Sequence, residues 1–343
     1  MRLAIVAEKP FLLDAFAPRL TEFFPAADFA RTPVFFPMMG WFGGPAKRFR
    51  LPRGLKWSEL PFVSEPAYRQ ITFTDARARI GVRELVGQTY PLVEAEAEQA
   101  FRDADVILAL MDACYSSAHL ALRFISDALG HFPKGRVLYP WIVDLTESGQ
   151  RRSLSEMRHF DEFALPLAMQ GELRRYFDYN YVANSLPIIG AATREAGLFG
   201  DSIPSKNGLQ LLYHMRESGP LSDGKLVDRM SKWKGTGKYK PVSGQYFGGL
   251  GSPSSRAPII DDMVRTRFIE RSGNDRHNKV FLTEEGNRFL ELLHPDCQDP
   301  DLPFRLDQWS RLPEAEAKEK INRYIRTFFG KQKAFFERVR HEH

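Results

Sequence analysis

Cysteine is scarce in this chain, and the two that occur stand alone. Cys114 and Cys297 lie far apart and belong to no CxxC or cysteine–histidine group. A disulfide framework needs several paired cysteines, and a structural zinc site needs closely spaced cysteine and histidine ligands. The sequence therefore indicates neither, and a reducing cytoplasm is the natural setting.

Long apolar runs are missing as well. A membrane helix needs about 20 mainly apolar residues, and no stretch of the chain approaches that length. The apolar run over residues 3–7 meets Glu8 and Lys9 at once, so it is too short for the core of a signal peptide. We expect a soluble, cytoplasmic protein without a membrane partner.

Charge and length bound the function and the organisation. Lysine and arginine total 48 against 43 acidic residues, which leaves a formal charge of +5. This excess favours a polyanionic partner without proving one. The 343 residues predict two or three domains at roughly 100–200 residues each.

The first 145 residues alternate between short apolar runs and stretches with helical spacing. This alternation predicts a Rossmann-like α/β domain over residues 1–145, with a parallel sheet and crossover helices. Strands are expected at residues 3–7, 105–111 and 137–143, and helices at residues 11–24, 91–102 and 117–129. Residues 32–66 are rich in proline, glycine and aromatic residues, which predicts an irregular excursion.

The rest of the chain is expected to be mainly helical. Ser153 and Glu156 have the spacing of a capping box at the start of a helical segment over residues 146–205. Three helices starting near residues 206, 222 and 254 precede two short strands, at 268–270 and 280–282. Three helices followed by a hairpin are the order of a winged helix-turn-helix, which we place at residues 206–312. A basic helix covers residues 313–343.

Two groups of residues in this winged-helix region are candidates for phosphate binding. Ser254, Ser255 and Arg256 open the third helix, where free amide groups and the helix dipole favour an anion. The loop of the hairpin can lie along a sugar–phosphate backbone, and its candidates are Arg271, Arg276, His277 and Lys279. The alternative is that this hairpin tip is simply solvated.

A third candidate lies between the second and third of these helices. Lys234, Lys238 and Lys240 alternate with Trp233 and Tyr239. Cations interleaved with aromatic rings are typical of surfaces where phosphates are neutralised and bases stack. A disordered charged linker explains the same composition equally well.

Acidic and basic side chains also follow the first two predicted strands. Glu8 and Lys9 come directly after the first strand, and Asp112 leaves the second at the same edge of the sheet. Glu8 and Asp112 together are enough for one Mg²⁺, which often takes only one or two protein carboxylates. The alternative is that Glu8 forms a helix cap or ion pair and Asp112 caps a helix. No catalytic nucleophile stands beside a base, because no GxSxG or Cys/His pair occurs.

Several motifs taken in order resemble the type IA DNA topoisomerases, and the topoisomerase III branch in particular. Residues 1–10, MRLAIVAEKP, resemble the first strand of that family's Toprim domain, and residues 56–62, KWSELPF, look like the excursion of that branch. Residues 249–260, GLGSPSSRAPII, are similar to its GIGTPATRAxII helix. LTEEG at residues 282–286 and DPDL at residues 299–302 resemble the family's LTPxG and DPDLT. The resemblance implies a Toprim-like first domain and a DNA-binding winged-helix domain.

The sequence departs from the family where catalysis occurs. The family's acidic DxDxE motif falls on Asp112, Cys114 and Ser116, so only its first carboxylate is kept. The family's cleaving tyrosine lies in a YPRTDS-like motif within a large insertion, and here the chain passes from Ala196 to Lys206 in a few residues. The resemblance therefore implies a degenerate relative in which Glu8, Lys9 and Asp112 are vestigial or candidate catalytic residues.

Three hypotheses follow. The first is a non-catalytic, bacterial-type protein that binds single-stranded or junction DNA in plasmid or mobile-element maintenance, in transfer or in defence, alone or within a larger DNA-processing complex. The second is an enzyme, either a Mg²⁺-dependent nuclease that uses Glu8 and Asp112 or part of a topoisomerase completed by a partner subunit. The third is a protein-docking scaffold.

Overall fold

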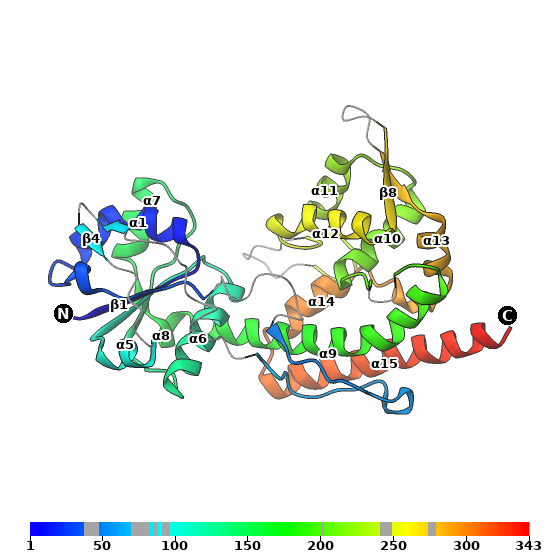
Figure 1. The fold of residues 1–343 in the computed structure, drawn as a ribbon, viewed down its shortest axis with the longest axis horizontal. Coiled ribbons are helices and arrows are strands. Elements are labelled where there is room, and N and C mark those ends of the chain that lie inside the picture. Colours follow the sequence, from blue (N-terminus) through cyan, green and yellow to red (C-terminus); the bar gives the residue numbers. More distant parts are fainter. Residues whose placement is uncertain are drawn as a thin grey trace. The chain divides into compact units, whose positions relative to one another are not determined.

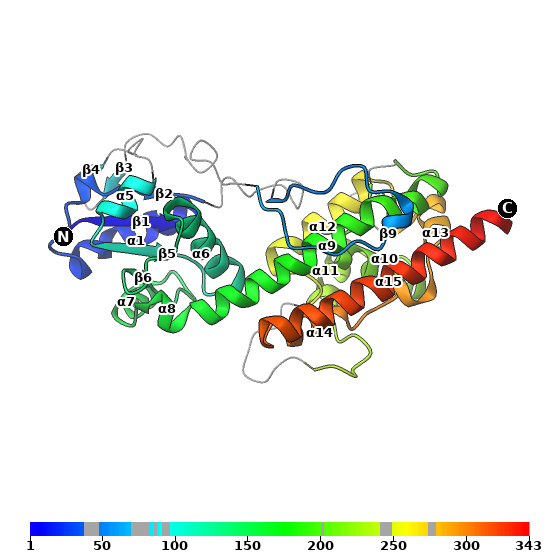
Figure 2. The same cartoon turned by 90° about the horizontal axis from the view of Figure 1, so that it is seen from below.

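A computed structural model describes residues 1–37, 48–69, 83–85, 88–90, 97–199, 202–240, 249–273 and 279–342 (Figures 1 and 2). The chain divides into two compact units. The first unit comprises Met1–Arg50 and Ala67–Arg175, and the second comprises Leu51–Pro66 and Tyr176–His343. None of the helices in the described ranges combines the length and apolar character required to span a bilayer.

A five-stranded sheet forms the centre of the first unit. Its strands lie in the order β2 (Val34–Phe35), β1 (Leu3–Ala7), β5 (Val106–Leu110), β6 (Val137–Tyr139) and β7 (Arg158–His159). The first four are parallel, and β7 runs antiparallel to β6. The predicted α/β architecture with a mostly parallel sheet is therefore confirmed. The segment over residues 146–205, expected to be mainly helical, also contains the strand β7, which the sequence did not predict because two edge residues show no periodicity.

Helices cover both faces of this sheet. All five residues of β1 are buried, and alternate side chains join two different clusters because a strand points successive residues to opposite faces. Leu3, Ile5 and Ala7 pack with α1 (Pro10–Phe23) and α7 (Glu147–Ser155). Ala4 and Val6 pack with the other cluster, which includes α5 (Ala97–Asp103), α6 (Tyr115–Leu129) and α8 (Phe160–Phe163). The continuous apolar run predicted as a buried strand is explained by this double cover.

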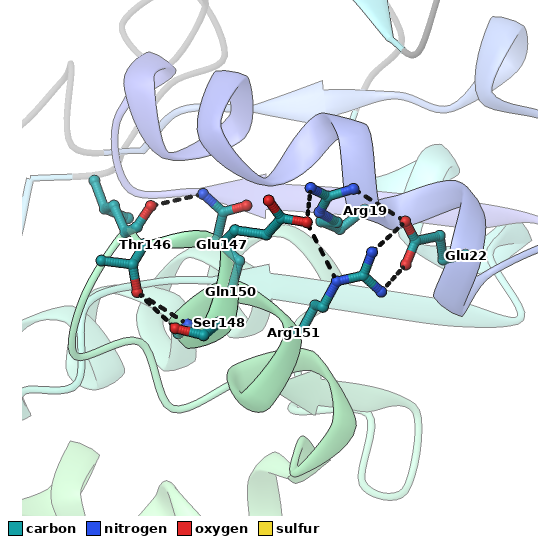
Figure 3. A network of polar contacts seen from close by, with 9 residues as sticks. Arg19, Glu22, Thr146, Glu147, Ser148, Gln150 and Arg151 are labelled. Atoms are coloured by element: carbon teal, nitrogen blue, oxygen red, sulfur yellow. Dashed lines mark hydrogen bonds and ion pairs between the residues drawn. The ribbon is translucent and has the colours of Figure 1, made fainter.

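Ion pairs connect α7 to α1 (Figure 3). Nη1 of Arg151 in α7 lies 2.6 Å from Oε2 of Glu22 in α1. Nη2 of Arg19 in α1 lies 2.5 Å from Oε1 of Glu147 in α7. Helix α7 begins after Thr146, whose side chain accepts a hydrogen bond from the amide of Gly149 at 3.1 Å. The predicted capping box at Ser153 was therefore wrong, because that residue lies inside the helix and its hydroxyl donates to the carbonyl of Trp141.

Outside the sheet, the first unit contains the short helix η1 (Phe29–Arg31) and the antiparallel pair β3 (Arg83–Leu85) and β4 (Gln88–Tyr90). The long helix α9 (Leu165–Glu195) begins in the first unit and continues into the second from Tyr176.

The second unit is mainly helical and is built on one apolar cluster. Its elements after α9 are α10 (Lys206–Ser218), α11 (Asp223–Ser231), α12 (Pro253–Arg265), β8 (Ile269–Ser272), β9 (Lys279–Leu282), α13 (Glu284–Glu291), η3 (Pro295–Cys297), α14 (Leu302–Trp309) and α15 (Glu314–Glu342). The three helices and the hairpin expected from the sequence are present. Helix α15 runs beside α9, where the rings of Tyr181 and Phe329 lie 5.3 Å apart (Figures 1 and 2).

Residues 51–66, which include η2 (Trp57–Glu59), belong to this second unit and lie on α9. Asn184 accepts from the amide of Phe62 and donates to its carbonyl, both at 2.7 Å. One turn earlier, Asn180 makes the same two bonds to Ser64 at 2.9 Å. Both asparagines are fully buried. Their side-chain amides make the hydrogen bonds that a neighbouring strand would otherwise make. The backbone amides and carbonyls of Phe62 and Ser64 therefore have partners although residues 51–66 are irregular.

Candidate functional site

Glu8 and Asp112 meet at the carboxyl edge of the sheet in the first unit. The register pairs Ala7 of β1 with Leu110 of β5, so the residues that follow the two strands lie side by side. The amide of Asp112 donates a hydrogen bond of 3.0 Å to Oε2 of Glu8. Glu8 is 3% exposed, whereas the side chain of Asp112 is 41% exposed. The predicted meeting of these residues is therefore seen, with one buried and one accessible carboxylate.

Lys9 lies between the two carboxylates. Its Nζ is 3.2 Å from Oε1 of Glu8 and 3.1 Å from Oδ2 of Asp112. Burial disfavours the charged ammonium, but the two carboxylates outweigh burial and raise the pKa of Lys9. The ammonium thus already supplies a cation that both acidic groups share. A divalent ion such as Mg²⁺ would have to displace it, so these residues as arranged do not fit a dedicated metal site.

Positions 114 and 116, two and four residues after Asp112, carry no carboxylate that could join this edge. Cys114 precedes α6, and its Sγ lies 3.1 Å from the hydroxyl of Ser117. The hydroxyl of Ser116 accepts a 2.6 Å hydrogen bond from Arg175. Tyr139 donates a 2.8 Å hydrogen bond to the carbonyl of Asp112. Burial is the main cause that raises the pKa of the Tyr139 hydroxyl, and the electrostatic effects of Cys114, Glu8 and Asp112 add to it. In the described ranges, no group of three or more His, Cys, Asp or Glu residues is arranged to hold a metal ion.

The start of α12 in the second unit presents hydroxyls, but its arginine is buried. Ser254 is exposed and Ser255 is half-buried, with the Ser255 hydroxyl bonded to the carbonyl of Ser252 at 2.9 Å. Arg256 is only 8% exposed. The structure therefore places the two serines, but not the guanidinium, where an anion could approach from solvent.

Two carboxylates bind Arg271 on the hairpin. Its Nη2 lies 3.0 Å from Asp223 of α11 and 2.6 Å from Asp261 of α12. The hydrogen bonds that the guanidinium donates to these two carboxylates raise its pKa. A phosphate would have to compete with them for this side chain. Lys279 is exposed at the start of β9, whereas Arg276 and His277 lie outside the described residues.

The lysine segment between α11 and α12 is held by the loop before α14. Asp301 accepts from the amide of Thr236 at 2.8 Å and from its hydroxyl at 2.5 Å. The indole of Trp233 donates a 2.8 Å bond to the carbonyl of Pro300. These bonds argue against a disordered linker over the described residues 232–240.

Its three lysines, Lys234, Lys238 and Lys240, are all exposed. The ammonium of Lys238 lies 5.7 Å from the ring of Tyr239, and the guanidinium of Arg305 lies 5.9 Å from the same ring. Arg305 also forms an ion pair with Asp299. These residues form an anchored, positively charged surface that includes the aromatic ring of Tyr239.

The arrangement is thus an α/β unit with a carboxylate–lysine–carboxylate group at its sheet edge, and a helical unit with an exposed lysine surface. No protein family profile matches the chain. Part of it is similar to DNA topoisomerase 3 of Bacillus thuringiensis (strain Al Hakam), at 30% identity over 92 residues, which are 27% of this chain and 11% of that protein.

Two further relatives carry the same name. DNA topoisomerase 3 of Bacillus licheniformis is 36% identical over 61 residues, which are 18% of this chain and 8% of that protein. That of Bacillus subtilis (strain 168) is 34% identical over 61 residues, with the same coverage. The matches span only a small fraction of these relatives' length. They support a topoisomerase-like relationship over part of the chain.

Sequence reasoning missed three arginines of the first unit, Arg50, Arg69 and Arg123, which line one hollow. The dense basic stretch KRFRLPR at residues 47–53 was the available signal. It was overlooked because it lies within an excursion that was expected to be irregular.

Proposed function

We propose that this protein binds single-stranded or junction DNA without cutting it, as a degenerate relative of type IA topoisomerases. The observation that carries the proposal is the lysine surface of Lys234, Lys238 and Lys240, which Asp301 holds in place beside Tyr239. Ordered lysines neutralise phosphates at little entropic cost, and an aromatic ring offers a stacking face that any base can use. The partial similarity to DNA topoisomerase 3 supports DNA as the ligand.

The proposal includes a winged helix-turn-helix over residues 206–312, made of α10, α11, α12 and the hairpin β8–β9. Residues 1–145 are its Toprim-like domain, residues 146–205 a helical segment and residues 313–343 a basic terminal helix. In this arrangement Ser254, Ser255 and Lys279 add contacts to the DNA backbone beside the lysine surface. Arg256 supports α12 from within the unit, because it is buried.

The sheet edge supports a non-catalytic role. Lys9 binds both Glu8 and Asp112, and the positions matching the rest of the acidic motif are Cys114 and Ser116. One exposed carboxylate that is already paired with an ammonium is poorly suited to hold a metal ion, which would be needed to neutralise the negative charge that develops during phosphoryl transfer.

The first test is fluorescence anisotropy with labelled single-stranded, duplex and forked DNA across a salt series. Reversing the charge of Lys234, Lys238 and Lys240 to glutamate should weaken binding to single strands by at least about tenfold. The slope of log affinity against log salt should fall by about 2, since each neutralised phosphate of a single strand contributes about 0.7.

The matched control reverses three exposed cations of the first unit, Arg31, Arg102 and Lys134, and changes the net charge equally. If this control weakens binding as much as the lysine variant does, the lysine surface is not a DNA site, and binding depends only on the net positive charge of the protein. If the unaltered protein binds no DNA, the proposal fails and the docking scaffold is favoured.

The second candidate is an enzyme, favoured by the meeting of Glu8 and Asp112 at one sheet edge. It predicts nicking or relaxation of supercoiled DNA with Mg²⁺ or Mn²⁺, in the presence of candidate partner subunits. That activity should disappear in the Asp112→Asn variant. Binding that is equal in Mg²⁺ and in chelator, with no nicked product, would eliminate this candidate.

A further inference from the structure

The first unit contains an open hollow of about 260 Å³ whose lining is strongly basic. Two short chain segments form one side of it. The amide of Arg50 donates to the carbonyl of Ala67 at 2.7 Å, and the amide of Arg69 donates to the carbonyl of Arg48 at 2.8 Å. Helix α6 contributes Arg123 and Asp127. Backbone pairing and a regular helix therefore hold three guanidinium groups around one space.

Among the described residues, Asp127 is the one acidic residue that lines this hollow, and its carboxylate is already engaged. Asp127 lies 2.9 Å from Nη2 of Arg123 on the same helix face. Within the described ranges, Arg50 and Arg69 form no ion pair, and both are exposed. Like charges gathered around one space repel one another, and an anion between them relieves that repulsion.

A buried histidine packs against Tyr68, one of the residues that line the hollow. His119 of α6 is fully buried, and its Nδ1 lies 3.2 Å from Oε2 of Glu172. Burial, and then Arg175, Arg123 and Arg48, lower its pKa well below the usual range. Burial and these three guanidinium groups therefore disfavour a protonated ring at this position.

Tyr68 provides a flat apolar wall in the hollow. Its hydroxyl donates a 3.1 Å bond to Glu172, and the guanidinium of Arg123 lies 4.7 Å from its ring centre. The rings of Phe49 and His119 pack against it at 5.4 and 6.1 Å. Contacts on several sides therefore hold the ring in place at the hollow.

We propose that this hollow binds the phosphate of a nucleotide, either free or within a nucleic acid strand, with Arg50 and Arg69 as the anion ligands. Guanidinium groups suit phosphate because their parallel N–H donors match its oxygens in pairs. Asp127 orients Arg123, and Tyr68 contacts the sugar or base attached to the phosphate. These residues are different from those of the lysine surface in the second unit, so this inference holds or fails independently of the DNA interface proposed above.

The test compares the unaltered protein with the double variant Arg50→Gln and Arg69→Gln and with the control variant Arg31→Gln. Binding of inorganic phosphate, thymidine monophosphate and a 5′-phosphorylated single strand is measured by calorimetry. The double variant should lose about tenfold or more in affinity for at least one of these ligands, while the control keeps its affinity. Loss for the free ligands alone indicates a nucleotide site, and loss for the strand alone indicates a strand phosphate.

A second measurement needs no variant. An arginine-selective dicarbonyl reagent is applied to the unaltered protein with and without ligand, and modified peptides are quantified by mass spectrometry. The ligand should protect Arg50 and Arg69 but leave Arg31 reactive. Equal modification with and without every ligand, or equal affinity of the double variant and the control, would overturn the proposal whatever the lysine surface does.

Discussion

The main-chain amide of Asp112 donates a 3.0 Å hydrogen bond to the buried carboxylate of Glu8. This bond links the ends of two parallel strands, and the ammonium of Lys9 reinforces it by contacting both side chains. A buried carboxylate is tolerated because it has one amide and one cation as partners. The pair therefore has a structural role whether or not the edge also carries chemistry.

Glu8→Gln should destabilise the first unit by about 1–3 kcal/mol, because it weakens a charge-assisted bond and leaves the ammonium of Lys9 with one partner fewer. In the Lys9→Met background the same change should cost at least about 0.5 kcal/mol less, since the two side chains contact each other. Urea unfolding of the four proteins in this double-mutant cycle measures the coupling. Strictly additive losses would show that the ion pair between Glu8 and Lys9 contributes nothing to the free energy of unfolding.

The raised pKa of Lys9 predicts a stability loss at alkaline pH. A group whose pKa is higher in the folded state stabilises the fold fully below its unfolded value of 10.5, and this contribution disappears as the pH rises through the folded value. The difference in unfolding free energy between the unaltered protein and Lys9→Met should therefore be constant below pH 10.5 and shrink as the pH rises above that value. Other lysines and tyrosines titrate in both proteins and cancel in this difference. A constant difference would contradict the ion pair.

Asn184→Ala should destabilise the second unit by about 1–3 kcal/mol, because it leaves the amide and carbonyl of Phe62 without their partner. Asn287→Ala on α13 is the matched control, since that side chain makes a single bond to the carbonyl of Thr283. Chemical unfolding followed by circular dichroism gives both values. Equal losses at the two positions would show that the bonds to Phe62 contribute nothing beyond a single side-chain bond to a helix carbonyl.

Gly235→Ala should loosen the lysine surface without changing its charge. Gly235 has φ of +58°, and a methyl group there would overlap the carboxylate of Asp301. We expect faster tryptic cleavage after Lys234 and Lys238, and single-strand affinity lower by about three- to tenfold because order is lost. The control is Gly224→Ala in α11, where a methyl group meets open space. If the two variants bind equally, order in this segment does not matter for DNA.

Arg271→Ala should change DNA affinity far less than the lysine variant does, since two aspartates already bind this guanidinium. Its main effect should be a stability loss of about 0.5–1 kcal/mol, because Asp223 and Asp261 are left facing each other at the surface. Anisotropy and urea unfolding separate the two effects. A loss of affinity comparable with that of the lysine variant would restore Arg271 as a direct phosphate ligand.

Local pattern was sufficient for much of the architecture. The apolar run of β1, the spacing of α10 and α11 and the start of α12 are all visible in short windows of sequence, because period and caps depend on neighbours in the chain. Glu8 and Asp112 could be paired from the sequence because the carboxyl ends of parallel strands lie at one sheet edge.

Other features depend on residues that are distant in the chain. The burial of Arg256, the two carboxylates on Arg271 and the anchoring of the lysine surface by Asp301 each join segments whose approach no local window records. The hollow of Arg50, Arg69 and Arg123 likewise exists only where an excursion returns to α6. The sequence by itself thus determined which elements form and the residue types near each end. The tertiary structure decided which charges face solvent and which are already neutralised, because burial and ion pairing depend on what packs against a side chain.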